Sequence, residues 1–80
     1  MNQSSKVPEN KFRRCYAAAV FAPDASMRRF IDRLTLDDVL LMDQIVAHRK
    51  KEFFDKYHPT ERTKRALMSG LKQMGLRFAD

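Results

Sequence analysis

Residues 35–57, TLDDVLLMDQIVAHRKKEFFDKY, form the longest helical pattern in the sequence and contain neither Gly nor Pro. Thr35 supplies a hydroxyl that can cap a helix, and Asp37 and Asp38 place carboxylates in the first turn, where the helix dipole favours negative charge. Cations gather at the other end, where the dipole favours them. We therefore predict a single helix over residues 36–57, about 33 Å long at 1.5 Å per residue, on which the rest of the chain packs.

The first half of this predicted helix is apolar on nearly every side, whereas the second half has a single apolar stripe. The widest stripe consists of Val39, Met42, Ile45, Val46, Arg49, Phe53 and Tyr57, flanked by Leu36, Leu40 and Leu41. A helix that is apolar all round is buried by several neighbours or by a second copy of the chain. We expect Leu40, Ile45 and Val46 to be buried, and the pattern leaves a homodimer open.

Three further helices are predicted from apolar residues at helical spacing, over residues 11–21, 25–34 and 61–74. Pro23 and Pro59 separate them from their neighbours, Thr60 is placed to cap the last helix, and Gly75 is placed to end it. The predicted fold is all-α: a small bundle of about four helices around the long central helix 36–57. Residues 1–10 are predicted to be a flexible arm and residues 11–80 a single helical domain.

Length and composition favour one small globular domain. The chain has 80 residues, of which 44% are apolar and 32% charged, and a domain this short is only marginally stable. Cys15 is the only cysteine, so no disulfide can form within the chain and a reducing, cytoplasmic location is expected. No apolar run approaches the ~20 residues that span a bilayer, so we expect no membrane association.

The charge is positive and unevenly distributed. The formal net charge is +6 and the sequence pI is about 9.9. Residues 48–77 hold nine Lys and Arg residues but only three Asp and Glu residues, whereas 35–43 holds three Asp and no cation. This asymmetry favours a polyanionic partner, although a solvated basic face is the simpler explanation.

No arrangement of side chains typical of a catalytic or metal site is visible. His48 and His58 have no metal-ligand spacing, and no glycine-rich phosphate loop is present. The acidic residues Asp37, Asp38 and Asp43 are explained by the preference of a helix start for negative charge. We therefore expect no enzymatic activity, no metal and no cofactor.

The clearest functional signal is a basic face on the predicted C-terminal helix. Arg62, Arg65, Ser69 and Lys72 recur at i, i+3, i+7 and i+10, opposite the apolar stripe formed by Leu67, Leu71 and Met74. Arg and Lys on such a face can neutralise phosphates and reach base edges in a major groove. The candidate nucleic-acid-binding residues are Arg49, Lys50, Arg62, Lys64, Arg65, Ser69 and Lys72.

The stretch TKRALMSGLKQMGLRF, residues 63–78, resembles the recognition helix and following strand of winged-helix regulators, in which the helix ends in Gly-Leu before the wing. The resemblance covers about a fifth of the chain and implies DNA binding through this helix. The sequence departs from the pattern because a wing needs a hairpin after the strand, and the chain stops at Asp80. A plain helix-turn-helix arrangement needs no wing.

Two functions of different classes compete. The first is a small basic regulator of transcription or replication that binds nucleic acid, double-stranded DNA in particular, through the basic face of the C-terminal helix. The second is a helical protein-interaction module that acts as an inhibitor or adaptor and docks on an acidic protein surface. Only the nucleic-acid-binding regulator is expected to bind any duplex with an affinity that decreases steeply as the salt concentration rises.

Overall fold

The computed structural model describes residues 10–79, and all regular structure in that range is helical. The helices are η2 Lys11–Arg14, α1 Ala17–Val20, η3 Ala25–Met27, α2 Arg28–Leu36, α3 Met42–Val46, α4 Lys50–Tyr57 and α5 Glu61–Gln73, where η marks a 3₁₀ helix. The all-α prediction is confirmed. The predicted arm, residues 1–10, lies outside the described residues except for Asn10, whose Nδ2 donates to the carbonyl oxygen of Met74 at 2.8 Å.

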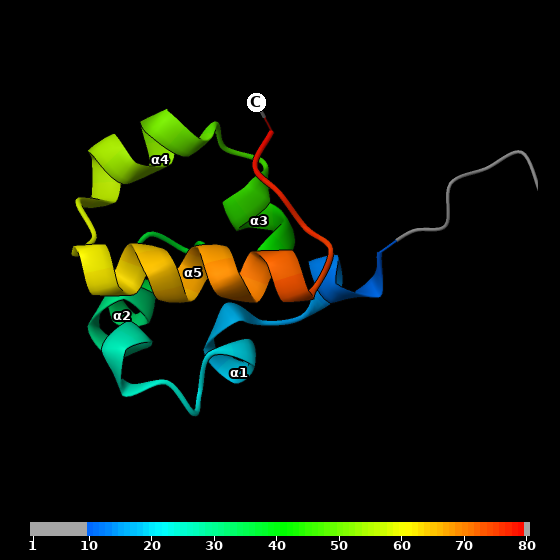
Figure 1. Ribbon diagram of the computed structural model, residues 1–80, viewed down its shortest axis with the longest axis horizontal. Helices are drawn as coiled ribbons and strands as arrows, with labels where there is room; N and C mark the ends of the chain where they lie inside the picture. Colours follow the sequence, from blue (N-terminus) through cyan, green and yellow to red (C-terminus); the bar gives the residue numbers. More distant parts are fainter. Residues whose placement is uncertain (1–9, 80) are drawn as a thin grey trace, which may run out of the picture.

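The longest helix, α5, is the element on which the others pack. Figure 1 shows it crossing the middle of the molecule, with α1 and α2 on one side and α3 and α4 on the other in that view. Its inner stripe is buried, with Leu67 0% and Leu71 1% exposed. Gly70 faces Phe21 so closely that an added Cβ would lie 2.6 Å from the ring atom Cε1. Glycine at this position therefore lets the segment after α1 approach α5.

The predicted single helix 36–57 is wrong, because the chain breaks twice within it. At the first break, Thr35 lies inside α2, and its Oγ1 donates to the carbonyl oxygen of Ile31 at 2.9 Å instead of capping a new helix. Asp38 adopts a left-handed conformation with φ 60°, which Asp tolerates better than most residues. The Gln44 side chain then holds the loop: its Oε1 accepts from the N–H groups of Leu40 and Leu41, both at 2.9 Å, and its Nε2 donates to the Asp38 carbonyl oxygen at 2.9 Å.

At the second break, the chain is extended at Arg49, with φ −77° and ψ 141°. His48 Nδ1 lies 2.8 Å from the carbonyl oxygen of Gln44, so this side chain covers the end of α3. The backbone N–H of Ala79 donates to the carbonyl oxygen of His48 at 3.0 Å. The C-terminal tail thus takes up a carbonyl group that a continuous helix would have used internally.

Of the other three predicted helices, one is wrong as a single element, one is observed as two consecutive helices and one is confirmed. The helix predicted over 11–21 is wrong as a single element: Cys15 and Tyr16 are extended between η2 and α1, and Met42 N donates to the Cys15 carbonyl oxygen at 2.9 Å. The helix predicted over 25–34 is observed as η3 followed by α2. The helix predicted over 61–74 is confirmed as α5, Glu61–Gln73.

Both ends of α5 follow the sequence signals. Thr60 Oγ1 accepts from the N–H of Thr63 at 3.2 Å, as expected of an N-cap. Gly75 has φ 70°, and the N–H of Leu76 donates to the carbonyl oxygen of Leu71 at 2.9 Å, which is the six-residue reversal of a Schellman motif. The tail after Gly75 forms no strand and runs back over the core, with Leu76 and Phe78 each 6% exposed.

The core is built from all five α-helices and the tail. Ile45 and Val46 are buried as predicted, at 0% and 2% exposure, and this burial requires no second copy of the chain. Leu40 is 37% exposed, so its predicted burial is wrong: it lies in the loop between α2 and α3 instead of on a helix.

An aromatic cluster lies at the centre of this core, around the fully buried Phe53 of α4. Its ring centroid lies 5.8 Å from that of Phe30 on α2, 5.0 Å from that of Tyr57 and 5.5 Å from that of Phe78 in the tail. The Phe30 ring meets Phe53 edge to face, at 84°. Such pairs add to the stability supplied by burial alone, so Phe53 ties α2, α4 and the tail together.

Gln44→Ala tests whether this side chain maintains the first break. We expect the free energy of unfolding to fall by about 1 kcal/mol, as for the loss of a helix cap. Gln44→Glu keeps the two accepted hydrogen bonds and should cost less. Urea denaturation measures both. A Gln44→Ala protein as stable as the wild type would show that the loop is held by other contacts.

Phe53→Ala should lower the free energy of unfolding by about 3–5 kcal/mol, because it leaves a large cavity among the rings. That loss is most of the stability of a small domain, so the variant should be largely unfolded at 37 °C. Leu36→Ala is the control, since Leu36 is 84% exposed and its removal should change stability by less than about 0.5 kcal/mol. Thermal unfolding followed by circular dichroism distinguishes the two; equal melting temperatures would contradict the central place of Phe53.

Candidate functional site

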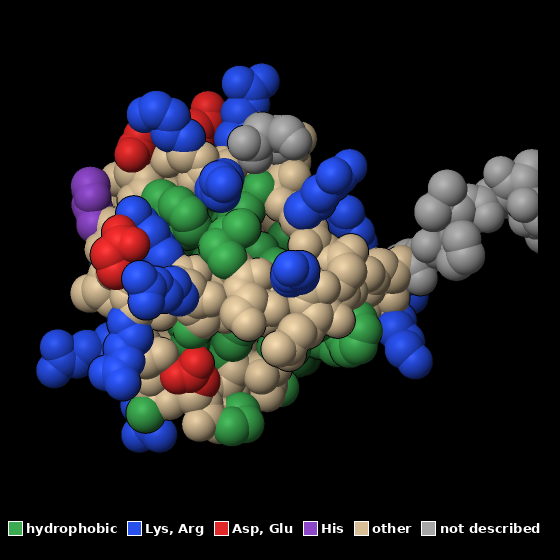
Figure 2. All heavy atoms as spheres, viewed as in Figure 1, with side chains coloured by type: hydrophobic (Ala, Val, Ile, Leu, Met, Phe, Trp, Pro, Cys, Tyr) green, Lys and Arg blue, Asp and Glu red, His purple; other side chains and the backbone are tan. Residues whose placement is uncertain are grey.

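Four of the seven predicted site residues lie together on one exposed face of α5, which we call the α5 basic face: Arg62, Arg65, Ser69 and Lys72. They fall within about a quarter of the helix circumference at 100° per residue. The buried residues Thr63, Leu67 and Leu71 occupy the opposite side. Figure 2 shows Lys and Arg side chains over this helix and around the rim of the same view.

The other three predicted residues lie elsewhere. Lys64 turns towards α4, with its Nζ 5.4 Å from the ring centroid of Phe54 and 3.4 Å from Glu61 Oε2. Arg49 and Lys50 are exposed at the N-terminal end of α4, the end away from the turn that leads into α5. With eight residues, α4 is about 12 Å long. The structure therefore separates Arg49 and Lys50 from the start of the α5 basic face.

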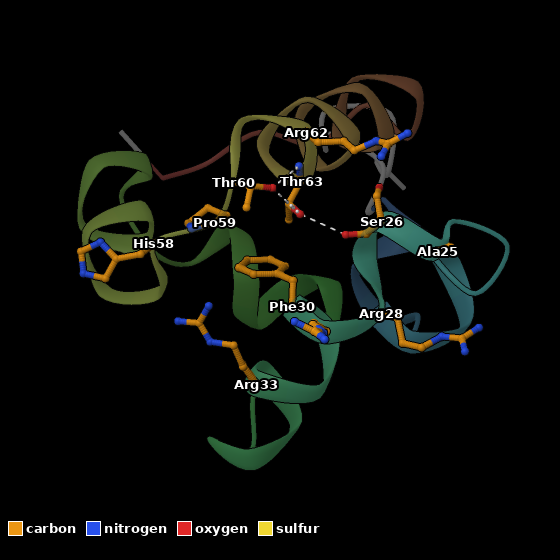
Figure 3. A pocket seen from close by; sticks show the side chains of 11 residues that line it. Ala25, Ser26, Arg28, Phe30, Arg33, His58, Pro59, Thr60, Arg62 and Thr63 are labelled. Carbon is orange, nitrogen blue, oxygen red and sulfur yellow. Dashed lines mark hydrogen bonds between the residues drawn. The ribbon is translucent and has the colours of Figure 1, made fainter.

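A pocket of about 620 Å³ opens where α2 meets the first turn of α5 (Figure 3). Its charged side chains are four arginines, three from α2 and one from α5, and we call it the arginine pocket. The residues that line it are Ala25, Ser26, Arg28, Arg29, Phe30, Arg33, His58, Pro59, Thr60, Arg62 and Thr63.

One hydrogen bond joins the two walls of the arginine pocket, and two others stabilise the wall formed by η3. Thr63, 6% exposed, donates through Oγ1 to the carbonyl oxygen of Ser26 at 3.0 Å, which joins α5 to η3. Asp24 Oδ1 accepts from the N–H of Ser26 at 3.0 Å and from its hydroxyl at 2.6 Å. Figure 3 shows the Thr60, Thr63 and Ser26 side of the pocket above Phe30. The walls are therefore fixed by cap and core contacts.

Among the described residues, no carboxylate lines the arginine pocket and none of its four arginines forms an ion pair. Ion pairs in this part of the chain lie elsewhere and include Arg13–Asp43, Lys51–Asp55 and Lys64–Glu61. Two acids lie near these arginines without lining the pocket: Asp24 and Asp32 line a neighbouring hollow with Arg28, and Asp24 lines another with Arg62. The lining of the arginine pocket itself is positive, because its charged side chains are all arginines.

Sequence reasoning did not identify this pocket. Of its four arginines, only Arg62 is among the seven candidate binding residues named from the sequence. The arginines of α2 meet Arg62 only through the tertiary contact between Ser26 and Thr63. The available local signal was the density of arginine in RRFIDR, with one Asp among three Arg.

Tyr57 fixes the end of α4 beside this region. Its hydroxyl donates to Asp37 Oδ2 at 2.7 Å, and Phe30 packs against its ring with centroids 6.1 Å apart. Burial, with the hydrogen bond to Asp37 and the charge of Asp37 as further causes, raises the pKa of Tyr57 to about 12. His58 follows in a left-handed conformation, φ 48°, and turns the chain towards Thr60.

Neither a metal cluster nor a membrane span is found in residues 10–79. No group of three or more His, Cys, Asp or Glu side chains in this range is arranged to hold a metal ion. No helix of the same range combines the length and apolar character needed to cross a bilayer. Comparisons with protein-family models, curated proteins and solved structures found no match.

Tyr57→Phe tests the hydrogen bond to Asp37 through its pH dependence. Because the pKa of Tyr57 is raised from 10.0 to about 12 in the folded protein, its contribution to stability is fully present below pH 10 and is lost as pH rises towards 12. Tyr57→Phe should cost about 1 kcal/mol near neutral pH, and the difference from wild type should shrink in that alkaline window. Tyr16→Phe, at a position 59% exposed, is the control and should match the wild type throughout.

Proposed function

We propose that the protein binds nucleic acid, in particular double-stranded DNA, through the α5 basic face. One observation carries this proposal: the helix presents Arg62, Arg65 and Lys72 to solvent from a rigid, buried foundation, and none of the three forms an ion pair within the described residues. Their charge is therefore available to a polyanion. A regulatory role in transcription or replication would follow from such binding.

The chemistry of these side chains suits phosphate and base contacts. A guanidinium group matches phosphate with two parallel hydrogen bonds, and Lys adds a point charge. The helix α5 has 13 residues, about 20 Å, and B-DNA has a major groove wide enough to admit an α-helix. Ser69 lies between the cations and offers a hydroxyl, which can contact either a phosphate or a base edge.

The connection between α4 and α5 also supports a helix-turn-helix mode of binding. Only three residues, His58–Thr60, separate the two helices. Turns of three to four residues are typical of that motif, in which the second helix enters the groove. In this arrangement α5 is the recognition helix, and α4 supports it through Phe54 and Lys64.

A protein-interaction module is the second candidate, and exposed apolar side chains favour it. Tyr16 is 59% exposed and Leu40 37% exposed, and the two segments lie together because Ala17 N donates to the carbonyl oxygen of Leu40 at 2.8 Å. Phe12 is 38% exposed. An inhibitor or adaptor would combine this apolar surface with the basic charge to dock on an acidic protein surface.

The double variant Arg65→Ala, Lys72→Ala tests nucleic-acid binding without touching the arginine pocket. If both side chains meet phosphates, affinity for mixed duplex DNA should fall for all sequences alike, and the slope of log K against log salt should decrease by about 2. The measurement is a fluorescence-anisotropy titration at several salt concentrations.

Lys11→Ala, Arg77→Ala is the matched control, because it removes one Lys and one Arg at exposed positions outside α5. Control and test variants that lose affinity equally would show a general charge effect and contradict the assignment to α5. Failure of the wild type to bind duplex DNA at low salt would favour the protein-interaction module.

A further inference from the structure

The arginine pocket has a second property beyond its net charge: its cations occupy locally unfavourable positions. Arg28 and Arg29 lie in the first turn of α2, and Arg62 lies in the first turn of α5, where the helix dipole disfavours positive charge. Arg29 and Arg33 are also spaced i, i+4, a spacing at which like charges destabilise a helix, whereas Arg28 and Asp32 at the same spacing have opposite charges. Each of these unfavourable electrostatic energies is small, but all of them involve arginines that line one pocket. A bound anion would reduce them together.

Size argues for a ligand larger than one phosphate ion. The pocket holds about 620 Å³, within the usual range of small-molecule sites. At about 30 Å³ per water-sized atom this is room for roughly 20 non-hydrogen atoms, whereas a phosphate ion has only a phosphorus and its oxygens. A chain of linked phosphates fills the space better.

The arrangement of the guanidinium groups points the same way. Figure 3 shows Arg33 on one side of the Phe30 ring and Arg62 and Arg28 on the other, where both extend outward beside Ser26. The guanidinium groups are therefore spread along the pocket and do not converge on one point. A ligand that engages both sides must carry negative charge at more than one position along its length.

The lining selects against other ligand classes. With four arginines and no described carboxylate in its lining, the pocket repels cations such as metal ions and amines. The polar groups apart from the arginines are the hydroxyls of Ser26, Thr60 and Thr63 and the His58 ring, while Phe30 is 3% exposed and closes the floor. Arginine pairs with phosphate oxygens in a bidentate geometry that lysine cannot reproduce.

We propose that the arginine pocket binds an oligophosphate, that is, two or more linked phosphate groups, held between the arginines of α2 and Arg62 of α5. The ligand can be a free nucleoside triphosphate or an inorganic oligophosphate, since the phosphate chain is common to both. Arg62 belongs to both this site and the α5 basic face, whereas Arg65 and Lys72 do not line the pocket, so the two proposals can be tested with different variants. The oligophosphate would act as a bridge that draws α2 and α5 together.

Isothermal titration calorimetry of the full chain with inorganic tripolyphosphate tests the proposal. We expect saturable binding with one ligand per chain for the wild type. Arg33→Ala and Arg62→Ala should each weaken it by about tenfold or more, the effect of losing a charge-assisted hydrogen bond. Arg33→Lys should recover only part of the affinity, because it restores the charge without the bidentate geometry.

Arg77→Ala is the matched control, since it removes one exposed arginine that lies outside both the pocket and the α5 basic face, and its affinity should stay within about twofold of the wild type. These side chains are exposed, so melting temperatures should confirm that every variant is folded. ATP titrated in parallel distinguishes the sources: tighter binding of ATP indicates a nucleotide, and tighter binding of tripolyphosphate indicates an inorganic ligand.

Three results would overturn the proposal: no saturable binding of tripolyphosphate or ATP at low salt, an Arg77→Ala effect as large as that of Arg33→Ala, or citrate binding as tightly as tripolyphosphate. The last would show a site for any multivalent anion and not for phosphate. Because the DNA assay relies on Arg65 and Lys72, loss of the oligophosphate proposal leaves that assay unaffected, and failure of DNA binding leaves the tripolyphosphate titration valid.

Discussion

Burial of Phe53 among the other rings is the interaction on which the rest of the fold depends. Phe53 comes from α4, yet it must touch Phe30 on α2 and Phe78 in the tail. A straight helix over residues 36–57 would carry Phe53 about 25 Å from the end of α2 at 1.5 Å per residue. The chain therefore bends at residues 37–41 and again at 47–49, so that α4 folds back and the rings meet. The free energy of burying large aromatic side chains outweighs the helical hydrogen bonds lost at the two breaks.

Sequence signals succeeded where they were local and failed where distant contacts decided the outcome. The bounds of α5 followed from Thr60 and Gly75, because cap and reversal geometry depends on a few neighbouring residues. The stretch 35–57 has strong helical periodicity and no helix breaker, and still breaks. The first break is stabilised by the Gln44 amide, which satisfies backbone groups of residues 38–41, and the second by Ala79, which is remote in sequence. Neither contact can be detected from the spacing of apolar residues.

The two candidate surfaces also differ in whether local sequence signals could predict them. The α5 basic face was predictable, since Arg62, Arg65, Ser69 and Lys72 recur on a single helix whose register is fixed by Leu67 and Leu71. The arginine pocket was not, because its walls belong to two helices that are brought together by the hydrogen bond from Thr63 to Ser26. Arg62 lies on both surfaces. Occupation of the pocket would therefore change the charge that the start of α5 offers to a larger polyanion, and the two proposed ligands would influence each other's affinity.

The reversal at Gly75 has a consequence for how the molecule is made. It sends the chain back across the core, so Leu76 and Phe78 cover α5 and the aromatic cluster, and Ala79 completes the hydrogen bonding at the end of α3. A ribosome adds these residues after all five α-helices have been synthesised. Until then, one side of Phe53 and Phe54 has no ring to pack against. We therefore expect the packing around Phe53 and Phe54 to be completed only after residues 76–79 have been added.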